Sequence, residues 1–378
     1  MSDRPPLSYG SQWIDDDDVE AVVRVLRSDW LTTGPTVEAF ERALIEVTAC
    51  HHAVAVNSGT AALHVAYAAA SVGADDEVIT SPLTFVATAS AALVLGAKIR
   101  FADVEPDTGN IDPRMVAELA NERTRVIAAV DYAGHPADYD ALAALPAAGA
   151  RTLVADAAHS LGATFRGRAV GTLADITTLS FHPVKAITTG EGGAVLTSRA
   201  SFAESARRFR NHGIVRASGL VPAWSYEVPA VGLNYRIPDI LCALGISQLR
   251  KLGAFLERRR TIAARYGEAF ADLGNVTIPA ERPDALSAWH LYVLRVRDAA
   301  RRDALFDALR AAGLLVQVHY IPVYWHPMFA ALGYRRGLCP HAETFAASAL
   351  SLPLYPRMDD DDVDRVIGTV RRCVAATL

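Results

Sequence analysis

Apolar and polar positions follow three successive patterns along the chain. Residues 15–27 start with four aspartates and continue with apolar positions at helical spacing, which predicts an amphipathic helix whose acidic start suits its positive end. A second helix is expected over residues 36–47, directly after a Gly-Pro pair. From residue 53 onward, short apolar runs alternate with alanine-rich stretches. Because buried strands that alternate with helices form parallel sheets, this part predicts a mostly parallel sheet with helices on both faces.

The predicted sheet consists of short strands joined by helices. Its expected strands are residues 53–56, 77–80, 99–102, 126–130, 152–155, 176–180 and 194–196. Helices are expected over residues 61–70 and 84–95, where small and apolar residues dominate. An α/β sheet of this kind binds ligands at the carboxyl ends of its strands.

The pattern becomes helical after residue 201 and changes again toward the C-terminus. Loops are expected over residues 213–238 and a long helix over residues 239–270. Beyond them, the apolar spacing predicts strands at residues 289–296 and 314–318 and helices at residues 299–312 and 359–376. We therefore expect two domains, a large one at residues 1–260 that includes the N-terminal helical segment and a small α+β one at residues 261–378.

The composition is that of an ordinary globular chain. Of its 378 residues, 51% are apolar and 21% are charged, which is enough chain to bury a large core without covalent cross-links. The formal net charge of −5 and the lack of long basic runs argue against nucleic-acid binding. The densest basic cluster, residues 258–260, follows a helix-like stretch and is predicted to be a solvated helix face rather than a phosphate-binding patch.

Neither a membrane segment nor a cysteine-based framework is predicted. Residues 78–97 lack charges over a length that could span a bilayer, but a proline, a glycine and a strand–loop–helix pattern favour buried core. The four cysteines are far apart and form no CxxC pair, so we expect no disulfides, no metal site and a reducing, cytoplasmic location. No apolar stretch follows a basic start, so no signal peptide is expected.

Polar residues follow three of the predicted strands. Residues 57–60, Asn-Ser-Gly-Thr, join a strand to a helix, where free backbone N–H groups and the helix dipole can bind a phosphate. An ordinary helix N-cap is the alternative interpretation. Asp156 ends a second strand, and its desolvation calls for a partner such as a protonated pyridine nitrogen, or for a role as a helix N-cap. His159 follows and could bind a ligand or be a structural histidine.

The third strand end carries a hydroxyl, a lysine and a glycine-rich segment. Ser180 ends the strand, Lys185 follows it, and residues 188–193 read Thr-Thr-Gly-Glu-Gly-Gly. A Schiff-base lysine needs a protected site beside a phosphate, to which Ser180 can donate a hydrogen bond, while the glycines allow close approach of the backbone. A lone lysine is more often a surface residue, but this setting argues against that interpretation.

The three strand ends together resemble the DegT-type sugar aminotransferases, which are pyridoxal-phosphate (PLP) enzymes of the aspartate-aminotransferase fold, or fold type I. The resemblance implies a large domain with a mostly parallel seven-stranded sheet and a small C-terminal α+β domain. It extends nearly from end to end, through residues 9–12, 57–63, 156–160, 180–193, 211–213, 232–236 and 351–354.

The resemblance implies the two catalytic roles. Lys185 would carry PLP as a Schiff base and then move the proton, with pyridoxamine phosphate as the intermediate form of the cofactor. Asp156 would pair with the pyridinium nitrogen and keep it protonated, so that the ring accepts electrons. Some relatives carry histidine at the lysine position and perform dehydration instead. Because Lys185 is present, ordinary aminotransfer is expected.

The resemblance also implies the remaining cofactor contacts. Gly59, Thr60 and Ser180 would hold the phosphate, Phe85 would stack on the ring, and His159 would approach the phenolic oxygen of the ring. A further contact is expected from across a homodimer, since Asn234 matches a residue that reaches the phosphate of the neighbouring subunit.

The expected substrates are a nucleotide sugar and L-glutamate. Residues 180–193 resemble the branch that aminates C4 of 4-keto-6-deoxy sugars, and within it the transaminases of pseudaminic acid biosynthesis, so a UDP-linked 2-acetamido-2,6-dideoxy-hexos-4-ulose is expected. dTDP-4-keto-6-deoxyglucose, a cyclitol ketone and a non-catalytic PLP-binding regulator remain alternatives. His319 and Tyr320 are candidate substrate contacts, although both could simply pack under the small domain. Arg216 and Arg236 are candidate diphosphate partners across the dimer, although both could form ordinary surface ion pairs.

Overall fold

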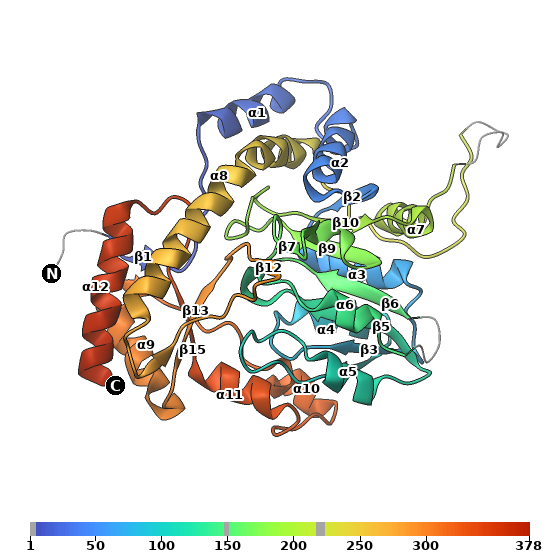
Figure 1. The fold of residues 1–378 in the computed structure, drawn as a ribbon. Coiled ribbons are helices and arrows are strands. Elements are labelled where there is room, and N and C mark those ends of the chain that lie inside the picture. The colour runs from blue at the N-terminus through green and yellow to red at the C-terminus, as the bar shows by residue number, and fades with distance from the viewer. Residues whose placement is uncertain (1–4, 147–150, 217–223) are drawn as a thin grey trace.

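A seven-stranded sheet lies at the centre of the molecule. The computed structural model describes residues 5–146, 151–216 and 224–378 (Figure 1). In spatial order, the strands of the sheet are β2 (His52–Val56), β10 (Gly193–Thr197), β9 (Ile176–Ser180), β6 (Thr152–Asp156), β5 (Thr124–Val130), β3 (Glu77–Thr80) and β4 (Lys98–Phe101). Strand β10 runs antiparallel to both of its neighbours, and the other pairs are parallel. The predicted mostly parallel, seven-stranded α/β sheet is confirmed.

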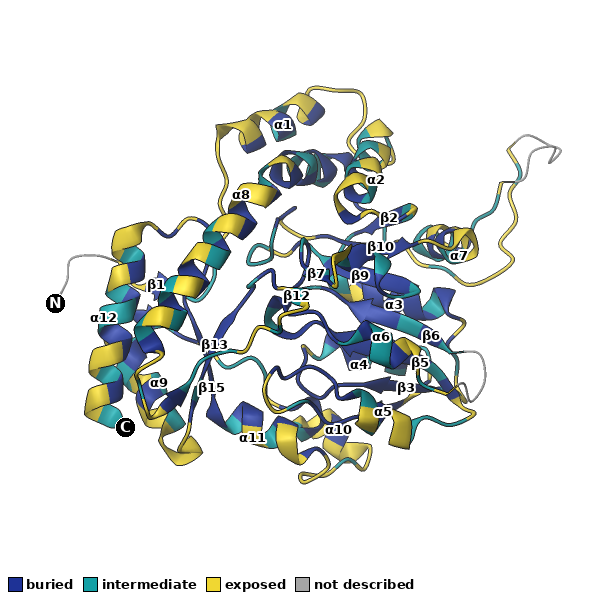
Figure 2. Cartoon of the chain, in the orientation of Figure 1, coloured by how far each residue is buried: buried dark blue, intermediate teal, exposed yellow. Residues whose placement is uncertain are grey.

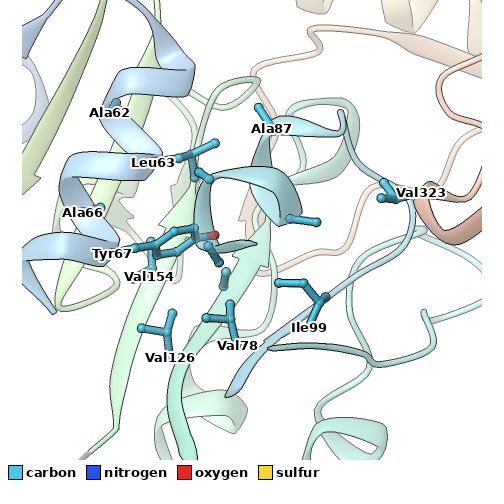
Figure 3. Packing of buried hydrophobic residues seen from close by; sticks show 14 of the residues in the cluster. Ala62, Leu63, Ala66, Tyr67, Val78, Ala87, Ile99, Val126, Val154 and Val323 are labelled. Atoms are coloured by element: carbon cyan, nitrogen blue, oxygen red, sulfur yellow. The ribbon is translucent and has the colours of Figure 1, made fainter. Parts of the chain in front are cut away.

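Both faces of this sheet are buried because its strands are apolar at successive positions. In β2, Val54 and Val56 belong to one apolar cluster, whereas Ala53 and Ala55, which point to the opposite face, belong to another. The helices packed around the sheet are α2 (Pro35–Thr48), α3 (Gly59–Ala69), α4 (Ala87–Val94), α5 (Pro113–Leu119), α6 (Tyr139–Ala143) and α7 (Ala200–Arg210). Figure 3 shows Leu63 and Tyr67 of α3 packing toward the sheet.

A second core lies beside the large sheet. It surrounds a sheet in the order β11 (Val276–Thr277), β13 (Tyr292–Val296) and β15 (Ala349–Leu352), and its helices are α9 (Arg302–Ala311) and α12 (Asp360–Thr377). Helix α8 (Asp239–Phe270) runs diagonally from the large sheet to this second core (Figure 1). The domain division expected at residue 260 falls within α8 and stays a prediction.

The remaining elements are short. They are α1 (Asp16–Leu26), α10 (Pro327–Ala331) and α11 (Pro340–Ser348), the paired strands β1 (Leu7–Ser8) and β14 (Leu314–Leu315), a small sheet of β7 (Thr164–Phe165), β8 (Arg168–Ala169) and β12 (Ala285–Leu286), and the 3₁₀ helices η1 (Tyr132–Gly134), η2 (Val170–Thr172), η3 (Ala299–Arg301) and η4 (Val323–Trp325). Helix α1 begins with a capping box at Asp15 and Asp18, as its acidic start suggests.

Three expected elements differ from the structure by three residues at one end. The helix expected at residues 84–95 begins at Ala87, because the chain after Pro82 first forms a turn. The strand expected from residue 289 begins at Tyr292, and that expected over 314–318 ends at Leu315. His319 and Tyr320 therefore lie on a loop rather than at the end of a strand. Two-residue strands such as β7 are too short to leave a periodic pattern.

The basic cluster Arg258–Arg260 is not a solvated helix face. All three residues are buried or half-buried, and Figure 2 shows buried and intermediate stretches along α8. Each guanidinium donates to backbone carbonyl oxygens, those of Met358, Leu354 and Ser287 among them. The expectation was wrong because long side chains at the junction of α8 with neighbouring loops can cap carbonyl groups that have no other partner. Among the described residues, no helix is long and apolar enough to cross a membrane.

Candidate active site

A cavity of about 420 Å³ opens at the carboxyl ends of β6 and β9. This volume lies within the range of roughly 300–1,000 Å³ that is usual for small-molecule sites. Three predicted strand ends contribute to it, together with the loop after β3. Its lining includes the predicted site residues Gly59, Thr60, Phe85, Asp156, His159, Ser180, Lys185, His319 and Tyr320. Residues from distant parts of the sequence thus meet in one place.

The start of α3 forms one end of the cavity. Ser58 is the N-cap, and its hydroxyl accepts a hydrogen bond from the backbone N–H of Ala61 at 3.0 Å. The capping interpretation and the phosphate interpretation are therefore compatible, since Gly59 and Thr60 still line the cavity. A Cβ atom at Gly59 would lie 2.8 Å from the Cβ atom of Ser180, so only glycine leaves the two strand ends this close. The result is a cradle of N–H groups and hydroxyls at a positive helix end.

Asp156 is buried at the end of β6 and does not cap a helix. The hydroxyl of Thr88 donates to its Oδ2 atom at 2.6 Å, and the N–H of Ala158 donates to its Oδ1 atom at 3.3 Å. Turns, not a helix, follow the strand, so the capping alternative is wrong. Burial raises the pKa of Asp156, while the Thr88 hydrogen bond opposes this rise. A cation opposite this carboxylate would stabilise its charged form.

Lys185 faces the same cavity from the loop after β9. Burial lowers its pKa to about 8, although the carboxylate of Asp156 opposes this shift. The loop is fixed by its own hydrogen bonds, because the carbonyl oxygen of Phe181 accepts from the N–H of Thr189 and from the hydroxyl of Thr188. An amine that loses its proton this readily is suited to nucleophilic attack on a carbonyl group.

Aromatic side chains form part of the cavity wall. The Nε2 atom of His159 is hydrogen-bonded to the hydroxyl of Tyr320 at 3.1 Å, and Nδ1 of His319 to the hydroxyl of Ser351 at 2.9 Å. Burial lowers the pKa of His159 well below its usual value and that of His319 to about 4, with the charge of Lys185 acting in the same direction. Both rings are therefore uncharged at neutral pH. Phe85, 60% exposed, presents its ring to the cavity.

Three predicted residues do not line this cavity. Arg216 and Arg236 line a second cavity of about 470 Å³ beside α2 and α7, and the exposed Asn234 lines neither of the two. Arg236 donates to the amide oxygen of Asn211 at 2.8 Å rather than to a carboxylate. A segment after α7 projects from the body of the molecule (Figure 1), whereas Asn234 pairs with Asn211 directly after that helix.

Thr88 and Tyr9 are among the lining residues that the sequence did not indicate. Thr88 holds Asp156, and its own hydroxyl is hydrogen-bonded to that of Thr84 at 2.7 Å. The spacing of Thr84 and Thr88, four residues apart in an apolar stretch, was the available signal. Tyr9 reaches the cavity because β1 pairs with β14, and its ring lies 4.8 Å from that of His319. No local pattern indicates that contact.

The residues of the cavity fit PLP. The phosphate has a glycine-lined helix start with two hydroxyls, the ring nitrogen has a buried carboxylate, and the aldehyde carbon has an amine of lowered pKa. The exposed face of Phe85 can cover a planar ring. Charge and hydrogen-bonding capacity therefore match at each end of the cofactor.

Solved structures with this fold are known. Helicobacter pylori PseC, an aminotransferase involved in the biosynthesis of pseudoaminic acid, matches with a TM-score of 0.93 and 32% identity over 98% of this chain and 100% of that one. Spr1654 of Streptococcus pneumoniae, in its PLP-form, matches with a TM-score of 0.92 and 30% identity over 99% and 100% of the two chains. Fold, site and neighbours define the class: the protein is a PLP-dependent aminotransferase of fold type I.

The family follows from the sequence matches. The model of the DegT/DnrJ/EryC1/StrS aminotransferase family matches residues 12–371, and the chain belongs to this family. The Bacillus subtilis spore coat polysaccharide biosynthesis protein SpsC is 38% identical over 97% of both chains. The Campylobacter jejuni UDP-4-amino-4,6-dideoxy-N-acetyl-β-L-altrosamine transaminase is 38% identical over 96% of both. The resemblance found in the sequence is confirmed.

Proposed function

We propose that the protein transfers the amino group of L-glutamate to the C4 ketone of a nucleotide-linked 4-keto-6-deoxy sugar. The observation that carries this proposal is the cavity in which Lys185, of lowered pKa, and Asp156 meet the glycine-lined cradle. Relatives named for amino-sugar synthesis support the sugar substrate. A non-catalytic regulator would not need a deprotonatable lysine opposite a buried carboxylate.

Each chemical role falls to a residue of the cavity. Bound PLP supplies an electron sink for the substrate carbon. Lys185 would hold the cofactor through its amine and would act as the general acid–base that moves a proton at the substrate carbon. Asp156, which accepts a hydrogen bond from Thr88, would keep the ring nitrogen protonated. Gly59, Thr60 and Ser180 would hold the phosphate, Phe85 would cover the ring, and His159 would contact its phenolic oxygen.

The sugar would lie against the side of the cavity formed by His319 and Tyr320. Both residues line the cavity near Tyr9 and offer an uncharged imidazole and a phenol as hydrogen-bonding groups. Among the described lining residues, Lys185 is the single lysine or arginine. The diphosphate and the carboxylates of glutamate therefore need cations from elsewhere.

We propose that a second subunit supplies these cations, in a homodimer. Val215 and Glu227 pair through two backbone hydrogen bonds within the segment that carries Arg216, and Asn234 pairs with Asn211 directly after α7. The same segment exposes Trp224 (80%) and Val231 (82%), which favours burial against a partner. In such a dimer Asn234 would reach the phosphate, and the arginines the diphosphate, of the neighbouring subunit.

Mixing two inactive variants tests this shared site. Lys185→Ala and Asn234→Ala subunits, exchanged at random, should regain about a quarter of wild-type activity, because half of the dimers would contain one intact site. Lys185→Ala mixed with Asp156→Asn is the matched control and should regain nothing, since both changes lie in the chain's own cavity. If the first mixture also stays inactive, Asn234 does not act across the dimer.

The identity of the sugar is tested by comparing the turnover of three substrates, each offered separately. With PLP and L-glutamate, the release of 2-oxoglutarate should be faster with UDP-2-acetamido-2,6-dideoxy-hexos-4-ulose than with dTDP-4-keto-6-deoxyglucose, by at least about tenfold in kcat/KM. A cyclitol ketone, which lacks a nucleotide, serves as the third substrate. Turnover of the cyclitol alone would contradict a nucleotide-sugar function. We also infer a cytoplasmic location, supported by four cysteines that form no disulfide.

A further inference from the structure

Arg259 is a buried cation without a carboxylate partner. Its side chain is 1% exposed, and none of the ion pairs among the described residues includes it. Its Nη1 atom donates to the carbonyl oxygens of Leu354 at 2.9 Å and of Trp289 and His290 at 3.3 Å each. Burial lowers the pKa of Arg259 to about 10, so the guanidinium stays charged at neutral pH. Burial of a charge costs free energy through desolvation, and hydrogen bonds to the three carbonyl oxygens offset part of that cost.

Two of the three carbonyl groups that Arg259 holds, those of Trp289 and His290, belong to an unfavourable turn. Trp289 has a φ of +47°, which a bulky residue rarely adopts. The next residue, His290, is packed so closely that a Cβ atom on Gly134 would lie 2.8 Å from its backbone nitrogen and 2.9 Å from the carbonyl oxygen of His159. Arg259 thus stabilises a turn that touches the loop carrying His159.

His290 lies directly behind His159. Their ring centroids are 4.2 Å apart with an interplanar angle of 34°, and His290 is not among the residues that line the active-site cavity. Their two Nδ1 atoms are buried without hydrogen-bond partners in the described part of the chain. The orientation of the His159 ring therefore depends on its contact with His290 and on one hydrogen bond, from Nε2 to the hydroxyl of Tyr320.

We propose that Arg259 and His290 are positioning residues: Arg259 fixes the turn at Trp289 and His290, and the His290 ring fixes the orientation of His159 in the cofactor cavity. This inference rests on the proposed role of His159 toward PLP. Neither positioning residue touches the cavity, so each acts through His159.

The charges around the two rings support one fixed, neutral arrangement. Burial lowers the pKa of His290 well below its usual value, and the neighbouring His159, Lys185, Arg259 and His319 act in the same direction. Protonation of either imidazole would place a third cation beside Lys185 and Arg259. The pair consequently stays uncharged at neutral pH, and packing against the His290 ring, together with the hydrogen bond to Tyr320, determines how His159 faces the cavity.

This chain of contacts is tested by the affinity of the apoprotein for PLP. Quenching of tryptophan fluorescence measures that affinity. His290→Ala and Arg259→Met should each raise the Kd for PLP about tenfold, whereas His290→Phe, which keeps an aromatic ring, should stay near wild type. Arg258→Met is the matched control. Arg258 lies beside Arg259 on α8, and its guanidinium donates to a different carbonyl oxygen, that of Met358. The Arg258→Met change should leave the affinity unchanged. If Arg259→Met fails to fold, the two His290 variants carry the test.

A double-mutant cycle separates positioning from a general loss of stability. In a His159→Ala background, His290→Ala should change the Kd for PLP by less than about twofold, because the residue that it positions is gone. Wild-type affinity in folded His290→Ala, or full additivity of the two losses, would overturn the proposal while leaving the proposed aminotransferase function intact. Failure of the wild-type protein to bind PLP would instead contradict that function itself.

Discussion

Lys185→Ala should lower kcat for aminotransfer by about 10⁴- to 10⁶-fold, because in the proposed function this one side chain would both bind the cofactor and move the proton. The release of 2-oxoglutarate from L-glutamate measures this loss. The chain has three lysines. When the wild-type protein is reduced with borohydride in the presence of PLP, the cofactor should become a permanent label on Lys185. The rate of attachment should rise with pH through about 8, the lowered pKa of Lys185, since the neutral amine is the reacting form.

Lys98 provides the control for this prediction. It is exposed at the start of β4, outside the cavity, so Lys98→Ala should keep wild-type activity and the label on Lys185. A label on Lys98 or Lys251, or undiminished activity of Lys185→Ala, would show that Lys185 has been assigned the wrong role.

Asp156→Asn is expected to have the second-largest effect, a fall in kcat of about 10²- to 10³-fold. An amide has nearly the shape of the carboxylate but cannot stabilise a protonated ring nitrogen by charge. The change should also lower the pKa of Lys185 below about 8, because the Asp156 charge now raises it. The pH profile of cofactor attachment should therefore shift toward acid, which distinguishes an electrostatic role from a loss of folding.

Thr88→Val gives a graded comparison with Asp156→Asn. It removes the 2.6 Å hydrogen bond to the carboxylate but keeps the charge, so the loss in kcat should be closer to about tenfold. Because that hydrogen bond lowers the pKa of Asp156, its removal should raise that pKa further. If the pH profile of cofactor attachment is the same in Asp156→Asn as in the wild type, the carboxylate of Asp156 does not act on Lys185.

Local sequence was sufficient for the sheet and for the positions of its chemistry. Strands such as residues 152–156 and 176–180 are short, largely buried and end in a polar residue, and the carboxyl ends of strands are where an α/β sheet binds ligands. Asp156, Ser180 and Lys185 could be chosen for this reason, and the resemblance then gave each of them a role.

The walls of the cavity could not be predicted in the same way. Tyr9 enters it only because β1 pairs with β14, more than three hundred residues later in the chain. The basic cluster Arg258–Arg260 was misjudged because a local pattern shows charge but not the backbone carbonyl groups that tertiary packing brings to it. Contacts between distant segments leave no periodic signal in the sequence.

By itself, then, the sequence determined an α/β sheet, three strand ends with polar residues, and a lysine and an aspartate suited to PLP. Only the tertiary structure decided that these strand ends meet in one cavity, that Thr88 holds Asp156, and that His290 lies behind His159. The physical reason is burial. The lowered pKa of Lys185 and the raised pKa of Asp156 come from desolvation by residues remote in the chain, which no local motif contains.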